Sequence, residues 1–64
     1  MSRLENNIEI LKKIESVVNN CPELRFIQIL WALGIIDGQD RFNEESADTK
    51  KIVDNNYDKM YYYK

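Results

Sequence analysis

The side chains that carry most enzyme and metal chemistry are scarce in this chain. It has 64 residues, a single cysteine, Cys21, and no histidine. Without histidine, neither a Ser–His nor a Cys–His nucleophilic pair can form. One thiolate without an imidazole also supplies too few ligands for a zinc site within one chain. We therefore expect no catalytic residue, no cofactor and no metal, and we do not expect an enzyme.

Cys21 itself admits two interpretations. It precedes Pro22 at the expected start of a helix, where the helix dipole could lower the pKa of its thiol. A free cysteine is more often a small, buried, apolar residue, and we favour that interpretation at a helix junction. A lone cysteine behind a charged start, Ser2-Arg3-Leu4-Glu5, also fits a reducing, cytoplasmic setting.

The acidic segment 37–48 is the second candidate for metal chemistry. It carries five acidic residues against one cation, Arg41. In a calcium-loop alignment that begins at Asp37, Arg41 falls among the ligands, Phe42 replaces the required glycine and Asp48 replaces the closing glutamate. The pattern favours a solvated turn that caps a helix. The alternative is an acidic docking surface for a basic groove. Its side chains would be Asp37, Asp40, Glu44 and Glu45.

Nucleic-acid contact is a further possibility, centred on the last 16 residues. Tyrosine rings can stack on bases while lysines contact phosphates, and this segment contains Lys50, Lys51, Lys59 and Lys64 with all four tyrosines. Against it, the net charge is −2, and no helix concentrates basic residues as a recognition helix does. Tyr57 and Tyr61 are four apart, and such tyrosines more often pack inward or across an interface. Nucleic acid is the less favoured partner.

Apolar spacing predicts three helices, roughly 3–19, 22–34 and 44–61. In the first, Ser2 and Glu5 form a capping-box pattern, and the residue before Pro22 is pushed out of helical conformation. Its apolar positions are Leu4, Ile8, Leu11, Ile14, Val18 and Cys21, widened by Ile10 and Val17.

The second helix is predicted from its two ends. Pro22 suits the first helical position. Gly34 suits the left-handed position after the last turn, with Ile35 folding back on Leu30 in a Schellman motif. Apolar residues nearly all round are typical of a buried helix. A buried strand over residues 25–30 is the alternative.

Arg25 and Gln28 are the only strongly polar residues within that apolar run. They lie three apart and so share a helix face. We expect a structural role for both, with Arg25 paired to Asp40 or Glu45 because guanidinium matches carboxylate geometry.

The third helix is predicted to be capped by Asn43 or Ser46. With Asn43 as cap, Phe42 and Ala47 occupy the two positions of a hydrophobic staple. The apolar stripe that follows is thinner than that of the first helix. Its members are Ile52, Val53, Tyr57, Met60 and Tyr61.

A chain this short rarely builds a sufficient core without a disulfide, a metal or a second subunit. We therefore predict an all-α, three-helix single domain (residues 1–64) that forms a homodimer through the second helix. Trp31 is either a core residue or an interface anchor, and we favour the interface. The predicted interface residues are Leu24, Ile27, Trp31 and Ile35. The longest apolar stretch, 26–36, is too short to span a membrane.

Part of the sequence resembles short uncharacterised open reading frames of bacteria, phages and prophages. They share a pattern of proline, Arg-Phe-x-Gln, an apolar helix, then Asp-x-Phe and Glu-Ser. The matching positions here are Pro22, Arg25, Phe26, Gln28, Asp40, Phe42, Glu45 and Ser46. Ile27 stands where those proteins often have glycine, which adds bulk at a point of close packing. The resemblance implies a phage accessory protein that blocks a host defence protein by binding it.

These observations predict a non-enzymatic inhibitor or adaptor that binds a protein, with a host defence or regulatory protein as its partner. The alternative is a small dimeric nucleic-acid-binding regulator that uses the lysines and tyrosines of the last helix.

Overall fold

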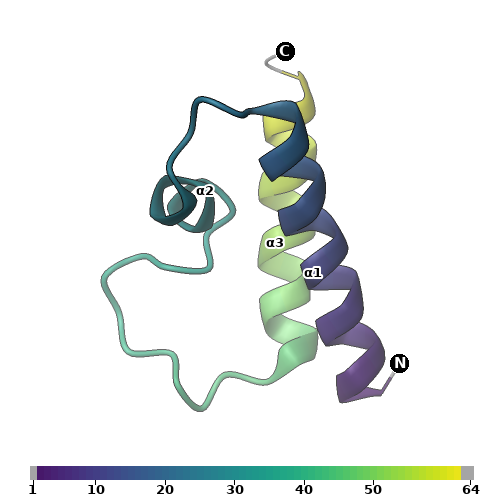
Figure 1. Cartoon of the computed structure of the whole chain (residues 1–64). Helices are drawn as coiled ribbons and strands as arrows, with labels where there is room; N and C mark the ends of the chain where they lie inside the picture. Colours follow the sequence, from purple (N-terminus) through teal and green to yellow (C-terminus); the bar gives the residue numbers. More distant parts are fainter. Residues whose placement is uncertain (1, 63–64) are drawn as a thin grey trace.

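The computed structural model describes the backbone of residues 2–62 and the side chains of residues 2–60. This part of the chain forms three helices, α1 (Arg3–Asn20), α2 (Phe26–Ala32) and α3 (Ser46–Tyr62), and no strand. Helices α1 and α3 lie side by side and run in the same direction, while the short α2 lies across them at one edge (Figure 1). The predicted all-α, three-helix architecture is confirmed.

Two side-chain contacts fix the parallel alignment of α1 and α3. Lys13 Nζ donates to Asp54 Oδ1 at 3.0 Å, and the hydroxyls of Ser16 and Tyr57 are 2.7 Å apart. Both pairs are separated by 41 residues, as expected for two helices that advance together. The connector, residues 33–45, makes this possible because it returns the chain to the end at which α1 begins (Figure 1).

The start of α1 is the capping box that its sequence predicts. Ser2 Oγ accepts from the Glu5 N–H at 3.1 Å, and Glu5 Oε1 accepts from the Ser2 N–H at 3.1 Å. The backbone bond from Ser2 and then the bond from its hydroxyl lower the pKa of Glu5. The helix ends at Asn20, with Cys21 as its C-cap.

Helix α2 begins at Phe26, so the prediction that Pro22 opens it is wrong. The Leu24 N–H donates to the Cys21 carbonyl at 3.1 Å, which forms a turn instead of helix. Gln28 Oε1 then accepts from the Arg25 N–H at 2.8 Å and fixes the start of the helix. The turn allows Leu24 to pack against the core.

The end of α2 is a Schellman motif, as predicted. The Gly34 N–H donates to the Trp31 carbonyl at 3.0 Å, and the Ile35 N–H donates to the Leu30 carbonyl at 2.9 Å. Gly34 has φ +78°, a conformation that residues with a Cβ rarely adopt. It therefore ends the helix at little conformational cost.

Helix α3 begins without the predicted caps. The Thr49 N–H donates to the Glu45 carbonyl at 3.1 Å, so Glu45 occupies the capping position and Ser46 is already helical. Asn43 lies in the connector. Phe42 is 91% exposed and Ala47 is also exposed, so the predicted hydrophobic staple between them does not form.

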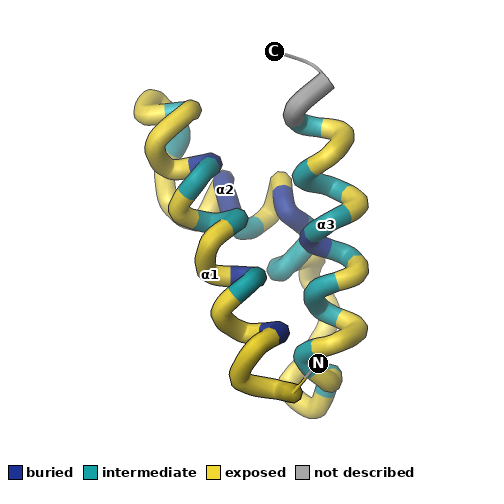
Figure 2. The backbone as a smooth tube through the Cα atoms, turned by 90° about the vertical axis from the view of Figure 1, so that its right-hand side faces the viewer, coloured by how far each residue is buried: buried dark blue, intermediate teal, exposed yellow. Residues whose placement is uncertain are grey.

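The core is small and lies between α1, α3 and the inner side of α2. Five apolar side chains are buried in the described part of the chain: Ile10, Val17, Ile29, Leu33 and Val53. Figure 2 shows the buried positions of α1 and α3 on the sides that face each other. The molecule measures 17 Å along its shortest axis, about one and a half helix diameters. Within one chain α2 is covered on its inner side only: Ile29 is buried, while Phe26, Ile27 and Trp31 are each more than half exposed.

Candidate functional site

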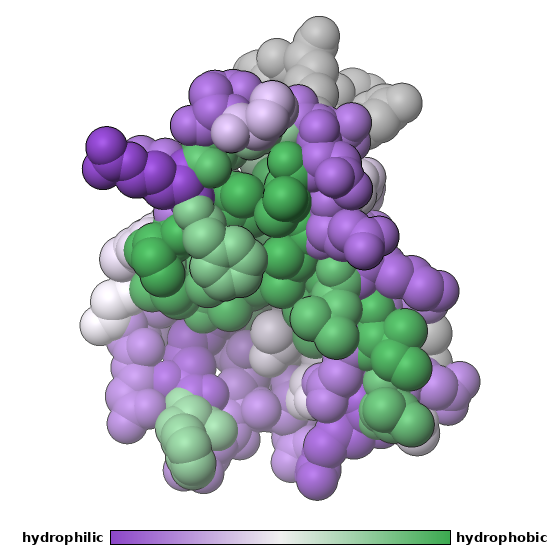
Figure 3. All heavy atoms as spheres, viewed as in Figure 1, coloured by the Kyte–Doolittle hydropathy of each residue, from purple (hydrophilic) through white to green (hydrophobic). Residues whose placement is uncertain are grey.

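The most prominent surface feature is an apolar band over α1 and α2. Seven large apolar side chains of these helices are between 41% and 68% exposed. They are Leu4, Ile8, Leu11 and Val18 of α1, with Phe26, Ile27 and Trp31 of α2. Figure 3 shows apolar side chains gathered on one face, from α2 across to α1, with hydrophilic side chains at the margins. We call these seven residues the apolar band.

Helix α1 contributes to the band because it carries two apolar stripes. Ile10 and Val17 are seven residues apart, almost two whole turns, and point into the core. Leu4, Leu11 and Val18 are also spaced by seven residues. Leu11 and Val18 each follow a core residue directly, and one residue corresponds to a rotation of about 100° around the helix axis, so this second stripe faces outward. Such a helix needs two apolar neighbours. Within the described part of this chain, only the inner stripe, Ile10 and Val17, is covered by neighbouring elements, and the outer stripe stays exposed.

Trp31 is half buried against its own chain and half exposed. Its exposure is 51%, and a Cβ added at Gly38 would lie 3.8 Å from its Cη2 atom, so one side of the indole faces the turn after α2. Ile27, one helical turn earlier, is exposed beside it. Leu24 and Ile35 are instead partly buried against the core. The predicted interface thus divides into two surface residues and two that support them.

The sequence interpretation missed the α1 half of the band and Phe26. It treated the apolar residues of α1 as a single stripe facing inward. A signal for two separate stripes was present in the sequence. Ile10 and Val17 form one series with a spacing of seven, and Leu11 and Val18 form a second series one position later. Which series faces inward depends on where α3 lies, and local spacing does not contain that information.

Arg41 organises the connector, and its importance was not predicted. Its Nε donates to Glu44 Oε2 at 2.9 Å, and its Nη1 donates to the Gly34 carbonyl at 2.6 Å and to Asp37 Oδ2 at 3.1 Å. The side chain is only 16% exposed. The connector is therefore tied to the end of α2 by one guanidinium group with several donors.

Glu44 joins this network to α3. Its Oε1 accepts from the Thr49 hydroxyl at 2.6 Å and from Arg41 Nη2 at 3.3 Å. These two hydrogen bonds, the one from Thr49 first, lower the pKa of Glu44. Charge-assisted bonds of this kind are stronger than neutral ones, so the carboxylate holds the start of α3 against the connector.

The predicted acidic docking surface is partly neutralised within the chain, because two cations, Arg41 and Arg3, lie beside three of its four carboxylates. Asp37 and Glu44 pair with Arg41, and Glu45 pairs with Arg3 at 3.3 Å. Asp40 caps its own turn by accepting from the Phe42 N–H at 3.0 Å. A basic partner would compete with these internal cations.

The predicted pairing of Arg25 with Asp40 or Glu45 is wrong. Within residues 2–60, Arg25 takes part in no ion pair, and Arg3 is the cation beside Glu45. The parallel arrangement explains this result, because it brings the first turn of α1, not α2, next to the start of α3.

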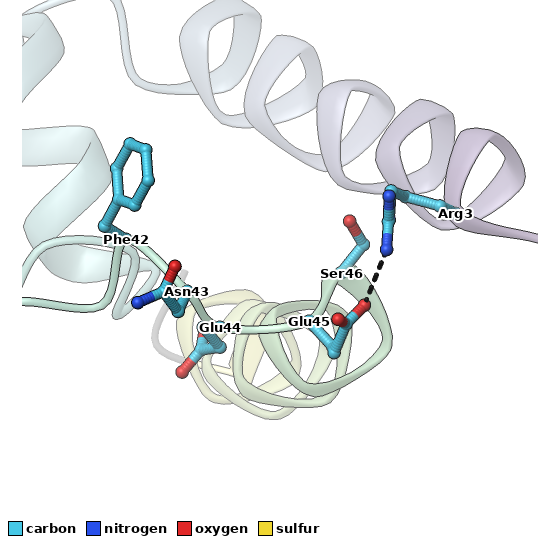
Figure 4. A pocket seen from close by; sticks show the side chains of 6 residues that line it. All are labelled: Arg3, Phe42, Asn43, Glu44, Glu45 and Ser46. Atoms are coloured by element: carbon cyan, nitrogen blue, oxygen red, sulfur yellow. Dashed lines mark hydrogen bonds and ion pairs between the residues drawn. The ribbon is translucent and has the colours of Figure 1, made fainter.

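A shallow hollow of about 310 Å³ lies beside the start of α3. Figure 4 shows Arg3 reaching to Glu45 across one side, while Phe42 projects away from that pair. A helix N-terminus attracts anions, but Glu44 and Glu45 already place two carboxylates there. The hollow is therefore poorly suited to an anionic ligand.

Two of the lysines and tyrosines predicted to contact nucleic acid, Lys50 and Tyr57, are engaged within the chain. Lys50 Nζ donates to Asp54 Oδ2 at 2.6 Å, and Lys13 Nζ lies 5.0 Å from the centroid of the Tyr57 ring. Partial burial alone would raise the pKa of Asp54, but the bonds from Lys50 and Lys13 lower it. Four predicted members of this tail are not covered: the side chains of Tyr61 and Tyr62, and the terminal residues Tyr63 and Lys64, lie outside the described part of the chain.

Among the described residues, no group of three cysteine or acidic side chains is close enough to hold a metal ion. None of the helices in this part of the chain has the length and apolar character needed to cross a bilayer.

A scan against protein-family models finds no match, and searches of curated proteins and of solved structures find none either.

Proposed function

We propose that the protein is a non-enzymatic inhibitor or adaptor that binds another protein through the apolar band. The observation that carries the proposal is the exposure of seven large apolar side chains on one face of α1 and α2. Monomeric proteins rarely expose contiguous apolar patches larger than a few hundred Å², and larger ones mark interaction sites. An uncovered band of this kind is unfavourable in water. A large apolar side chain gains about 1.5–3 kcal/mol on passing from full exposure to full burial, and these seven are still about half exposed.

The composition of the band supports a protein partner. Trp31 and Phe26 are aromatic, and aromatic anchors carry much of the energy at protein interfaces. The band contains no charged side chain, and charge is depleted at the centres of interfaces. The margins are hydrophilic (Figure 3), which matches an apolar centre with a polar rim.

The fold holds the band in place before binding. Gly34 ends α2 in a Schellman motif, and Arg41 ties the connector to the Gly34 carbonyl. The turn at Gly38 supports one side of Trp31. A preformed surface loses less conformational entropy on binding, so the internal network contributes to affinity without touching the partner.

The sequence resembles short open reading frames of bacteria, phages and prophages, which supports a partner in bacterial cells. We propose a cytoplasmic protein, encoded by a phage or prophage, whose partner is a host defence or regulatory protein. The same apolar band is also our proposed surface for self-association.

A pull-down with matched variants tests this function. The immobilised chain should recover one dominant protein from a bacterial lysate, and Trp31→Ala should lose it because half of the indole is available to a partner. Phe42→Ala is the control, since Phe42 is exposed but belongs to the connector. Recovery that is the same for the parent chain and both variants would count against the apolar band as the binding surface.

A further inference from the structure

We infer that a second copy of this chain covers the apolar band, in a two-fold symmetric dimer formed by α1 and α2. This inference rests on the proposed function, because it names an occupant of the same surface. It also adds a form of regulation. Self-association and binding of another protein would be mutually exclusive.

The area of the band matches what a stable dimer needs. Its seven side chains are about half exposed on average. An aromatic side chain has about 150–250 Å² to bury, and the five aliphatic side chains of the band have somewhat less. The band therefore presents on the order of 700 Å² per copy, close to the roughly 800 Å² that each partner buries in a specific interface. Either helix alone presents only about half of that area.

The small core gives the chain a reason to self-associate. Among the described side chains, five apolar ones are buried, in a molecule 17 Å thick. A domain of this size buries only about 60% of the surface of its unfolded chain. Small folds usually gain further stability from disulfides, metals or oligomerisation. A second copy is the one partner that is present wherever this chain is made.

The charge distribution is compatible with the same face meeting itself. Residues 1–36, which contain both helices of the band, carry four acidic and four basic side chains. Two copies can therefore approach through this region without net repulsion. In a two-fold dimer each copy presents the same surface. The aromatic α2 end of one copy can then pack on the aliphatic α1 stripe of the other, and the reverse contact follows by symmetry.

Sedimentation velocity across a wide dilution series tests the inference. The full chain should sediment as a dimer and dissociate on dilution. Leu11→Glu and Ile27→Glu each place a charge in the centre of the interface, so each should raise the dimer dissociation constant at least about a hundredfold. Phe42→Glu introduces the same charge on an exposed residue outside the band, and it should leave the dimer unchanged.

Two outcomes would overturn the inference: a folded parent chain that is monomeric at every concentration, or a dimer that persists in both band variants. A monomer that still captures a lysate protein through Trp31 would leave the proposed function standing. Leu11 and Ile27 are 63% and 55% exposed, so the substitutions spare the buried core, and far-ultraviolet circular dichroism checks their helix content. If a variant unfolds, the melting temperature of the parent chain decides, because a dimer melts at a higher temperature as concentration rises.

Discussion

At the scale of single residues, Gly34 brings α2 and α3 closer than any other amino acid would allow. A Cβ at this position would lie 2.6 Å from Asn56 Nδ2 and 2.7 Å from Ile52 Cγ2. Asn56 Nδ2 uses this proximity to donate to the Leu33 carbonyl at 3.2 Å. Leu33 itself is completely buried. One glycine therefore serves both the helix end and the contact with α3.

The two glycines provide a matched test of this role. Gly34→Ala should lower the free energy of unfolding by at least about 2 kcal/mol, from the left-handed backbone and from displacement of Ile52 and Asn56. Gly38 also has a positive φ, +85°, but a Cβ there meets only Trp31 at an ordinary contact distance. Gly38→Ala should therefore cost about 1 kcal/mol, from the backbone alone. Urea unfolding measures both, and equal losses would contradict the close approach at Gly34.

At the scale of elements, α1 and α3 are joined by a partly buried cluster of charges as well as by the core. Asp54 accepts from Lys13 of α1 at 3.0 Å and from Lys50 of its own helix at 2.6 Å. The pKa of Lys50 is raised, chiefly because its ammonium group donates this hydrogen bond to Asp54. The cluster lies beside the contact between Ser16 and Tyr57, and together these contacts fix the parallel alignment.

The lowered pKa of Asp54 predicts how this cluster responds to acid. A carboxylate with a lowered folded-state pKa stabilises the fold above its unfolded value, about 3.9, and loses that contribution as pH falls through the folded value. Asp54→Asn should therefore be less stable than the parent chain near neutral pH, and the difference should shrink below about pH 4. Urea midpoints measured across this range test the prediction. Asp58→Asn, on an exposed residue of the same helix, is the control. A constant difference for Asp54→Asn at all pH values would refute the role of its charge.

The sequence predicted those elements whose signals are local. The capping box at Ser2 and the Schellman motif at Gly34 each depend on residues within one or two turns, and both form as expected. The start of α2 was mispredicted because Pro22 is a good first helical residue in isolation. In the folded chain the turn before Arg25 places Leu24 on the core, and that tertiary contact prevails over the local preference.

The parts of the candidate site that could not be predicted depend on long-range placement. Arg41 reaches the Gly34 carbonyl, seven residues earlier, only because the connector turns back toward the end of α2. Leu11 and Val18 belong to the surface only because α3 covers the other stripe of α1. Ile27 and Trp31 were identified in advance as candidates for an interface, and the structure exposes both.

At the scale of the whole molecule, the chain forms a thin fold with one apolar face left uncovered. The internal polar network fixes the connector, while the apolar band spans the two helices that precede it. The apolar area of the band is close to that of a specific interface. The central claim is that another protein chain covers it, either a second copy or the partner that the protein inhibits or adapts.

Fluorescence quenching of Trp31 is the most direct test of this claim, because the chain has no other tryptophan. At high protein concentration, or in complex with a captured partner, the indole should be protected from acrylamide and its emission should shift to shorter wavelength. Leu11→Glu should restore quenching, although Leu11 lies on a different helix from Trp31. The contrary result is quenching that is equal in the parent chain, the variant and the complex, which would show that nothing covers the apolar band.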